Sequence, residues 1–244
     1  MLLSGIMLKM GLYSVIRWQL PIAPLAAKTY MPYLIGLSIA GVIYGSVVAL
    51  RQKDLKKLLA YSSLAHVGLI AAGCYTLTLD GLSGAVSQMI AHGFVIVGLF
   101  FAAEIIFRRY ETRKIAEMGG IREQTPKFTS MFMILVLASV ALPGTFNFVG
   151  EFTVLYSLSQ VNIWFAVLGG TTIILGAYYM LKMFQNTMLG ETNAKAFADV
   201  TTNEAIVLVV IIGFLLFFGL YPKPLVDLVT PSLNEILISI NRFN

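Results

Sequence analysis

Long apolar runs set the first constraint on this sequence. A membrane-spanning helix needs about 20 mainly apolar residues, and seven runs approach or exceed that length: residues 1–19, 32–50, 58–78, 82–107, 128–158, 160–188 and 203–221. Charged residues make up 12% of the 244 residues, against about 25% in a soluble domain. No run shows strand periodicity. The connections TLDG, after the third run, and SLSQVN, after the fifth, are very short, so consecutive helices must be antiparallel neighbours. The sequence therefore predicts an all-α membrane protein, with seven transmembrane helices packed as one compact bundle.

Both ends of the chain differ from ordinary spans. The run over residues 1–19 is short and begins abruptly, so we expect it to be the remainder of a longer helix, with Met1 an internal methionine or a late start. After the last span, PKPLVDLVTPSLNEILISINRFN alternates apolar with polar residues and predicts an interfacial amphipathic tail. Pro231 is expected to divide this tail into two pieces.

Basic residues predict the orientation. Of the 17 Lys and Arg residues, twelve fall on one side of the predicted spans: Arg51, Lys53, Lys56, Lys57, Arg108, Arg109, Arg113, Lys114, Arg122, Lys127, Lys182 and Lys195. Four fall on the other side: Arg17, Lys28, Lys223 and Arg242. The positive-inside rule then puts the N-terminus and the basic loops in the cytoplasm and the C-terminus outside. Membrane topology explains the net charge of +5 better than nucleic-acid binding does. Glu104 is expected to pair with Arg108, four residues later.

Lys9 lies inside the first run, in SGIMLKMGLYSVIRW. Ionisable groups within spans are costly, so they usually face the protein interior and mark ion or proton pathways. Tyr13 and Arg17 follow at i+4 and i+8, on the same helix face. The simpler alternative is a lysine that extends to the membrane edge.

The two histidines of the chain fall in adjacent spans. His66 follows Ser62 by one turn in LAYSSLAHVG, and His92 follows Gln88 by one turn in SQMIAHG. Each alone is explained by a hydrogen-bonded core histidine, and two histidines on different helices can in principle ligate one haem. No metal site is expected, because further ligands at close spacing are missing. Because histidine titrates near neutral pH, the pair favours a proton relay.

Glu151 ends PGTFNFVGEF, a stretch that interrupts the fifth run. Pro143 removes a backbone donor and collides with the preceding turn, so the run predicts a broken helix over 128–158. Non-helical backbone at membrane depth is tolerated only inside protein or beside water, and transporters place such breaks near ion sites. A simple proline kink is the alternative.

Together these stretches identify a resemblance. SGIMLKMGLYSVIRW, RQKDLKKLLAYSSLAHVG, GAVSQMIAHGFVIVGLFF and ALPGTFNFVGEF resemble the C-terminal half of antiporter-like subunit 4, the bacterial NuoM type, of respiratory NADH:quinone oxidoreductase (complex I). The resemblance covers essentially the whole chain. It implies half of an inverted-repeat fold: residues 1–31 as the last helix of the first repeat with an external loop, 32–190 as the second five-helix repeat, and 191–244 as the final span and tail.

The resemblance also implies roles. Lys9 matches the lysine that links the first half-channel to the centre, His66 and His92 match the central relay, and Glu151 matches the terminal proton site of the exit half-channel. A proton-translocating fragment of a bacterial plasma-membrane complex is implied, with other antiporter-like subunits and the missing N-terminal half as partners. No cofactor is expected in this chain, because FMN, iron–sulfur clusters and quinone belong to other subunits. No nucleotide-binding or cysteine-pair redox motif occurs in it.

Three other functions fit parts of the pattern. A sodium/proton antiporter module would use a similar buried charge series. A seven-span receptor agrees with the helix count alone, and the buried lysine and glutamate argue against it. A membrane anchor with an inert polar core would leave function unchanged when both histidines are replaced by alanine.

Overall fold

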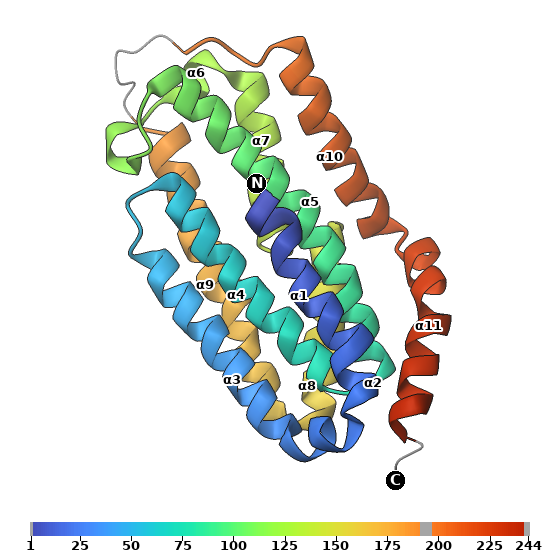
Figure 1. Cartoon of the computed structure of the whole chain (residues 1–244). Helices are drawn as coiled ribbons and strands as arrows, with labels where there is room; N and C mark the ends of the chain where they lie inside the picture. Colours follow the sequence, from blue (N-terminus) through green and yellow to red (C-terminus); the bar gives the residue numbers. More distant parts are fainter. Residues whose placement is uncertain (1, 191–196, 242–244) are drawn as a thin grey trace.

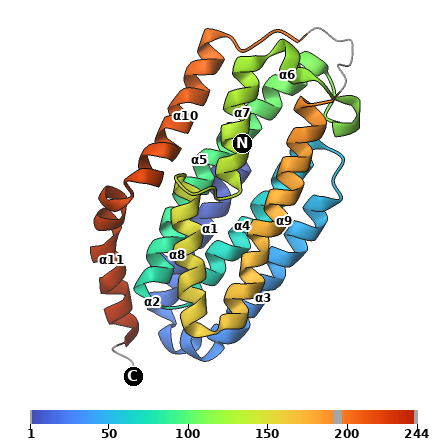
Figure 2. The same ribbon diagram turned by 180° about the vertical axis from the view of Figure 1, so that it is seen from behind.

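The computed structural model describes residues 2–190 and 197–241. This part of the chain is all-helical, with one isolated bridge between Asp54 and Lys114 in place of any strand. The long helices lie side by side in an elongated bundle (Figures 1 and 2). Five described helices are long and apolar enough to cross a membrane: α3 (Pro24–Leu50), α4 (Leu55–Tyr75), α5 (Leu79–Tyr110), α9 (Ile163–Met188) and α10 (Thr202–Leu220). The predicted all-α membrane class is confirmed.

The N-terminal segment is helical almost to the start of α3. It consists of η1 (Leu3–Met7), α1 (Leu8–Ser14), η2 (Val15–Gln19) and α2 (Leu20–Ile22), where η1 and η2 are π-helical turns. Ala23, at φ −128° and ψ 57°, makes the turn, and Pro24 begins α3. Proline suits the first position of a helix because an amide N–H there would have no partner within the helix. The sequence predicted an external loop before residue 32. The structure corrects this, because residues 24–31 belong to α3, which continues through Pro32.

The centre of the bundle is formed by α4 and α5, and more than half of the most apolar stretch of each helix is buried. The other three span candidates are mostly exposed, as expected for helices that face lipid. α4 packs along α3, and α5 packs along α8 (Phe146–Val161). The connection between α4 and α5 is residues 76–78, and Asn162 alone separates α8 from α9. These short connections, predicted from the sequence, make consecutive helices antiparallel neighbours.

The helix that contains the PGT stretch stops and restarts. α7 (Pro126–Ser139) ends before Pro143, and α8 begins at Phe146. Ala141 and Gly144 between them have φ of 55° and 92°. The turn is closed by Thr145, whose amide and hydroxyl both donate to the Leu142 carbonyl, at 3.0 and 2.7 Å.

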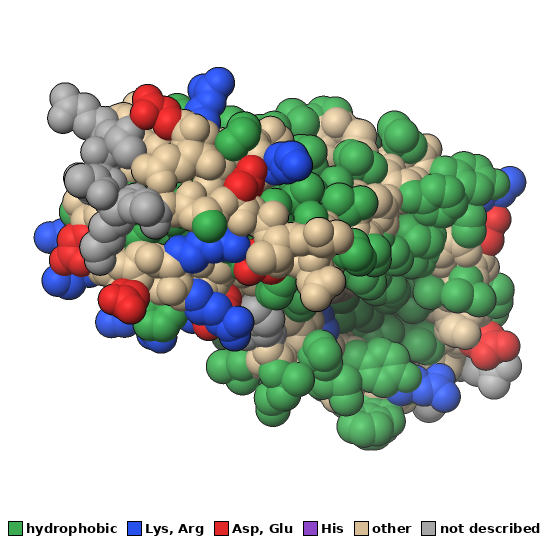
Figure 3. Space-filling view, turned by 90° about the horizontal axis from the view of Figure 1, so that it is seen from above, with side chains coloured by type: hydrophobic (Ala, Val, Ile, Leu, Met, Phe, Trp, Pro, Cys, Tyr) green, Lys and Arg blue, Asp and Glu red, His purple; other side chains and the backbone are tan. Residues whose placement is uncertain are grey.

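Charged side chains concentrate at one end of the bundle, on the loops that join α3 to α4 and α5 to α7; these include η3 (Ile115–Glu117) and α6 (Ile121–Gln124). Glu104 pairs with Lys56 at 2.6 Å and with Arg108 at 3.2 Å, so the predicted Glu104–Arg108 pair is present. Figure 3 shows most charged groups gathered on one side of the view and a few at the opposite edge, with many apolar side chains between them. Lys195 and Arg242, used in the orientation argument, lie outside the described residues.

The C-terminal tail is one helix, α11 (Lys223–Asn241), with Pro231 inside it. The expected break at Pro231 is wrong. α11 runs along the same edge of the bundle as α10 and packs against α5 (Figures 1 and 2). Its two faces differ, with Leu233, Ile236 and Ile240 buried and Leu228 78% exposed. The amphipathic character predicted from the sequence is therefore present.

The crossing of α3 and α4 gives a test of the fold. A Cβ at Gly45 would lie 2.9 Å from the Ala65 amide nitrogen, whereas a Cβ at Gly41, one turn earlier, would meet no atom within 4 Å. Gly45→Ala must therefore push α4 away next to His66. We expect it to lower stability by about 1–3 kcal/mol, measured as a lower thermal midpoint of the purified protein. Gly41→Ala is the matched control; equal midpoints for the two variants would contradict this packing.

Candidate functional site

Both histidines lie in the interior, on the two central helices. His66 on α4 is 3% exposed and His92 on α5 is 2% exposed. Their ring centroids are 5.1 Å apart. The sequence predicted that they act together, and the structure brings them into direct contact. Rings this close leave no space for a porphyrin between them, so the haem alternative does not fit.

Glu151 joins the histidine pair from α8. It is 1% exposed, and its Oε1 lies 2.9 Å from His66 Nδ1. Gln88 on α5 donates from Nε2 to the same oxygen at 2.8 Å. The imidazole contact is close enough for an ion pair but lacks the direction of a hydrogen bond. Three helices thus bring an imidazole and an amide to the same oxygen of one carboxylate.

A glycine allows this approach. A Cβ at Gly150 would lie 2.7 Å from the Gln88 Cα and 2.6 Å from its Oε1. α8 and α5 therefore touch through the backbone of Gly150, and the neighbouring Glu151 is carried to the Gln88 amide. A second glycine allows a close approach at the helix break, because a Cβ at Gly219 of α10 would collide with the Gly144 carbonyl oxygen.

Several polar atoms of this cluster have no hydrogen-bond partner among the described residues. They are Glu151 Oε2, Gln88 Oε1, His92 Nδ1 and both amide atoms of Asn147. Asn147, one turn before Glu151, is fully buried. Buried polar groups are almost always hydrogen-bonded, to protein or to ordered water. A group of such atoms at one place forms a site suited to bridging water.

Lys9 lies apart from this cluster but near His92. The N-terminal segment crosses α5 at Gly5 and Gly93, where a Cβ on Gly93 would lie 3.3 Å from the Gly5 carbonyl. Lys9 is 9% exposed and its Nζ donates to the Ser4 carbonyl, in the π-helical turn η1. Such turns are frequent at functional sites. The order in space therefore differs from the order in the chain: Lys9 is nearer His92, and His66 contacts Glu151.

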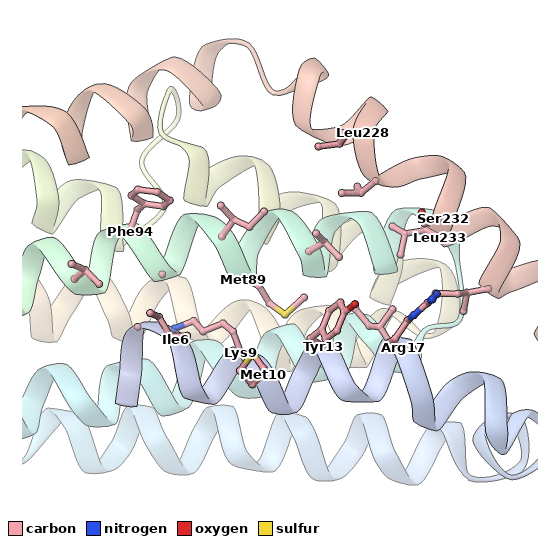
Figure 4. Close-up of a pocket in the computed structure, with 18 of the residues that line it drawn as sticks. Ile6, Lys9, Met10, Tyr13, Arg17, Met89, Phe94, Leu228, Ser232 and Leu233 are labelled. Atoms are coloured by element: carbon pink, nitrogen blue, oxygen red, sulfur yellow. The ribbon is translucent and has the colours of Figure 1, made fainter. Parts of the chain in front are cut away.

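A cavity of about 960 Å³ opens beside Lys9. The predicted face of Lys9, Tyr13 and Arg17 lines it; in Figure 4, Arg17 extends toward α11, whereas Lys9 runs back along its own segment toward Ile6. The other lining residues are mainly apolar, such as Met89 and Phe94. The structure thus confirms that Lys9, Tyr13 and Arg17 share one helix face, and it places Lys9 beside this cavity.

The sequence did not single out one further contact. Tyr179 on α9 is 2% exposed, and its hydroxyl lies 3.0 Å from Ser62 Oγ, one turn from His66. Tyrosine is common in apolar helices, so its sequence carries no distinguishing signal. Among the described residues, no group of three His, Cys, Asp or Glu is placed to hold a metal ion.

Several apolar spans around a buried ionisable cluster define a multi-span membrane protein with polar chemistry in its interior. The chain belongs to the family described as "NADH:quinone oxidoreductase/Mrp antiporter, TM", whose model matches residues 1–176. This family membership confirms the resemblance and removes the basis for a receptor.

Individual relatives agree with the family assignment. The chain is 40% identical over 240 residues to NADH-quinone oxidoreductase subunit M of Rickettsia prowazekii, covering 97% of this chain and 49% of that protein. It is 34% identical over 239 residues to NADH-ubiquinone oxidoreductase chain 4 of Arabidopsis thaliana, covering 97% and 48%. The chain thus spans about half the length of these curated relatives.

Solved structures share the fold. A chain of respiratory complex I from Thermus thermophilus with bound NADH superposes with a TM-score of 0.91 at 30% identity, covering 95% of this chain and 50% of that one. A chain of the Mrp complex from Dietzia sp. gives a TM-score of 0.87 at 17% identity, covering 97% and 54%, and shows the fold alone.

The Gly150 approach gives a test of the site. Gly150→Ala must displace Gln88 and so separate its amide from Glu151. We expect a loss of about 1–3 kcal/mol of stability from overpacking, read as a lower thermal midpoint. Gly170→Ala on α9, where a Cβ meets no atom within 4 Å, is the control. An unchanged midpoint for Gly150→Ala would show that α8 does not approach α5 this closely.

Proposed function

We propose that the chain is the C-terminal half of an antiporter-like, proton-translocating subunit of NADH:quinone oxidoreductase, with Glu151 as its terminal proton site. The observation that carries this proposal is the contact of Glu151 with His66 and Gln88, deep among apolar helices. A carboxylate in that position is expensive unless it is paired or changes its protonation. The family membership supports the assignment to this complex.

The proposed architecture has seven spans. They are the five apolar helices, the N-terminal helical segment over residues 3–22, and a discontinuous span made of α7 and α8. Residues 32–190 then form the second five-helix repeat. The basic loops face the cytoplasm and the C-terminus faces outside, according to the positive-inside rule.

The proposed path follows the spatial order Lys9, His92, His66 and Glu151. Histidine suits the middle positions because it accepts and releases protons near neutral pH. Bridging waters connect the groups, since Asn147 and the free oxygen of Glu151 have no protein partner in the described part of the chain. The helix break between α7 and α8, which precedes Glu151 in the chain, supports this reading, because membrane proteins tolerate non-helical backbone only inside protein or beside water.

The complex supplies what this chain lacks. Relatives named as subunit M and chain 4 of the NADH oxidoreductases are about twice as long. The N-terminal half and neighbouring antiporter-like subunits are the proposed partners. The redox steps, with FMN, iron–sulfur clusters and quinone, are assigned to other subunits, and this chain carries protons only.

A sodium/proton antiporter module is the second candidate, because the family description includes the Mrp antiporters. Sodium needs several oxygen ligands around one point. Besides one carboxylate, the described cluster contains the amide oxygens of Gln88 and Asn147, but its two imidazoles bind protons and, once protonated, repel a sodium ion. The chemistry of the site therefore favours protons.

Replacement of the carboxylate tests the proposal. Glu151→Gln in the complete subunit, within the assembled complex, keeps the size of the side chain and removes its titration. NADH-driven acidification of inverted membrane vesicles should fall about tenfold or more per assembled complex, because lost proton-transfer groups typically cost ~10²–10⁴-fold. Glu151→Lys should retain part of the activity, since lysine also titrates.

Two controls accompany this experiment. Glu104→Gln removes a carboxylate whose side chain is 30% exposed and pairs with Lys56, and should leave pumping normal. Replacing sodium by potassium should also change nothing. Normal pumping and normal quinone reduction in Glu151→Gln would refute the proton-site role, and activity lost without sodium would favour the antiporter module.

A further inference from the structure

A second cavity, of about 760 Å³, lies at the end of the bundle that carries the basic loops. Its walls come from the connection between α3 and α4, from the segment around η3, and from the C-terminal half of α9. Gln52, Ala116 and Asn186 are among the lining residues. α4 contributes Leu58 to the lining and also carries His66. The other walls carry none of the four proposed proton sites.

The deep wall of this cavity is Tyr179. Its side chain is 2% exposed, and its hydroxyl lies 3.0 Å from Ser62 Oγ. The neighbouring Tyr178 also lines the cavity but is 58% exposed. Tyr179 therefore has one edge on the cavity and its hydroxyl directed into the protein.

One face of α4 continues the route inward. Leu58 lines the cavity, Ser62 lies one turn deeper, and His66 one turn deeper again. Each step of four residues advances about 6 Å along the helix axis. His66 in turn contacts Glu151 at 2.9 Å. Polar groups thus extend from the basic end of the bundle to the buried carboxylate.

We propose that this cavity and the Tyr179–Ser62 pair form a proton entrance from the basic side to His66 and Glu151, separate from the path through Lys9. The inference rests on the proposed proton-site role of Glu151. It gives this half of the subunit its own access to the cytoplasmic side.

Hydroxyl groups suit the transfer because each can accept one hydrogen bond and donate another. A proton from cavity water joins the Tyr179 oxygen while Tyr179 releases its own proton to Ser62 Oγ. Ser62 releases its proton toward His66, so both hydroxyls end neutral and reset by rotation. Ser62 and His66 lie one turn apart on the same face of α4, and a bridging water completes this last step.

The described lining of the mouth offers a metal cation no carboxylate ligand. Arg51, Lys53 and Lys182 line the cavity, and the described lining residues include no Asp or Glu. A hydrated sodium ion would meet like charges and no carboxylate to replace its water. A proton passes by exchange along hydrogen bonds, without an ion entering the pair.

Removal of the buried hydroxyl tests the entrance. Tyr179→Phe in the assembled complex should lower NADH-driven proton translocation per assembled complex by about tenfold. Tyr44→Phe on α3, a tyrosine that is 62% exposed and lies outside the cavity lining, is the control and should pump normally. Ser62→Ala should resemble Tyr179→Phe, and the double variant should be no worse than either single one, because both remove the same link. Normal translocation in Tyr179→Phe would overturn the proposal.

Blocking the mouth gives a second readout. Asn186→Cys, exposed at the cavity, should lose translocation when a bulky, membrane-impermeant thiol reagent is added to inverted vesicles. Lys57→Cys, exposed nearby but outside the cavity lining, should not, and neither should the complex without an added cysteine. Full activity of labelled Asn186→Cys would overturn the entrance.

The result with Glu151→Gln separates the two proposals. If Glu151→Gln loses translocation and Tyr179→Phe keeps it, the entrance is wrong and the terminal proton site stands. If both variants pump normally, the function proposed for this chain is wrong as well.

Discussion

A carboxylate held between three helices in an apolar bundle is the constraint on which the rest of the structure depends. Glu151 is 1% exposed, and one oxygen meets both His66 and Gln88. An isolated charge in such surroundings is too costly to keep, so the group must be paired or protonated. The backbone is adapted to that need, because α8 reaches α5 only where Gly150 omits a side chain. The remaining polar atoms of the cluster, without protein partners in the described residues, make it a place for water.

The interruption between α7 and α8 lies close to this cluster in the chain, and the cavity lined by Tyr179 leads toward it from the basic loops. The first opens the backbone near Glu151, and α10 holds it through the close contact at Gly219. The second reaches from the basic loops to Ser62, one turn from His66. In the proposed entrance, His66 is the step that would pass a proton from Ser62 to Glu151.

The sequence singled out Lys9, His66, His92 and Glu151 because ionisable groups stand out within apolar runs. It also predicted the helix class, the short connections and the amphipathic tail. It did not predict that His66 rather than His92 meets Glu151, because that depends on where three helices cross. Tyr179 was missed because tyrosine is ordinary in such helices. Two expectations were wrong beside prolines: α3 begins at Pro24 and continues through Pro32 where a loop was expected, and α11 continues through Pro231 where a break was expected.

The central claim is that Glu151 changes its protonation during turnover, and infrared difference spectroscopy on the assembled complex measures this most directly. Spectra would be compared between the resting state and NADH-driven turnover, for the native complex and for Glu151→Gln. The account predicts a carboxyl C=O band that changes during turnover in the native complex and is missing in the variant. Identical carboxyl bands in the two complexes would contradict it.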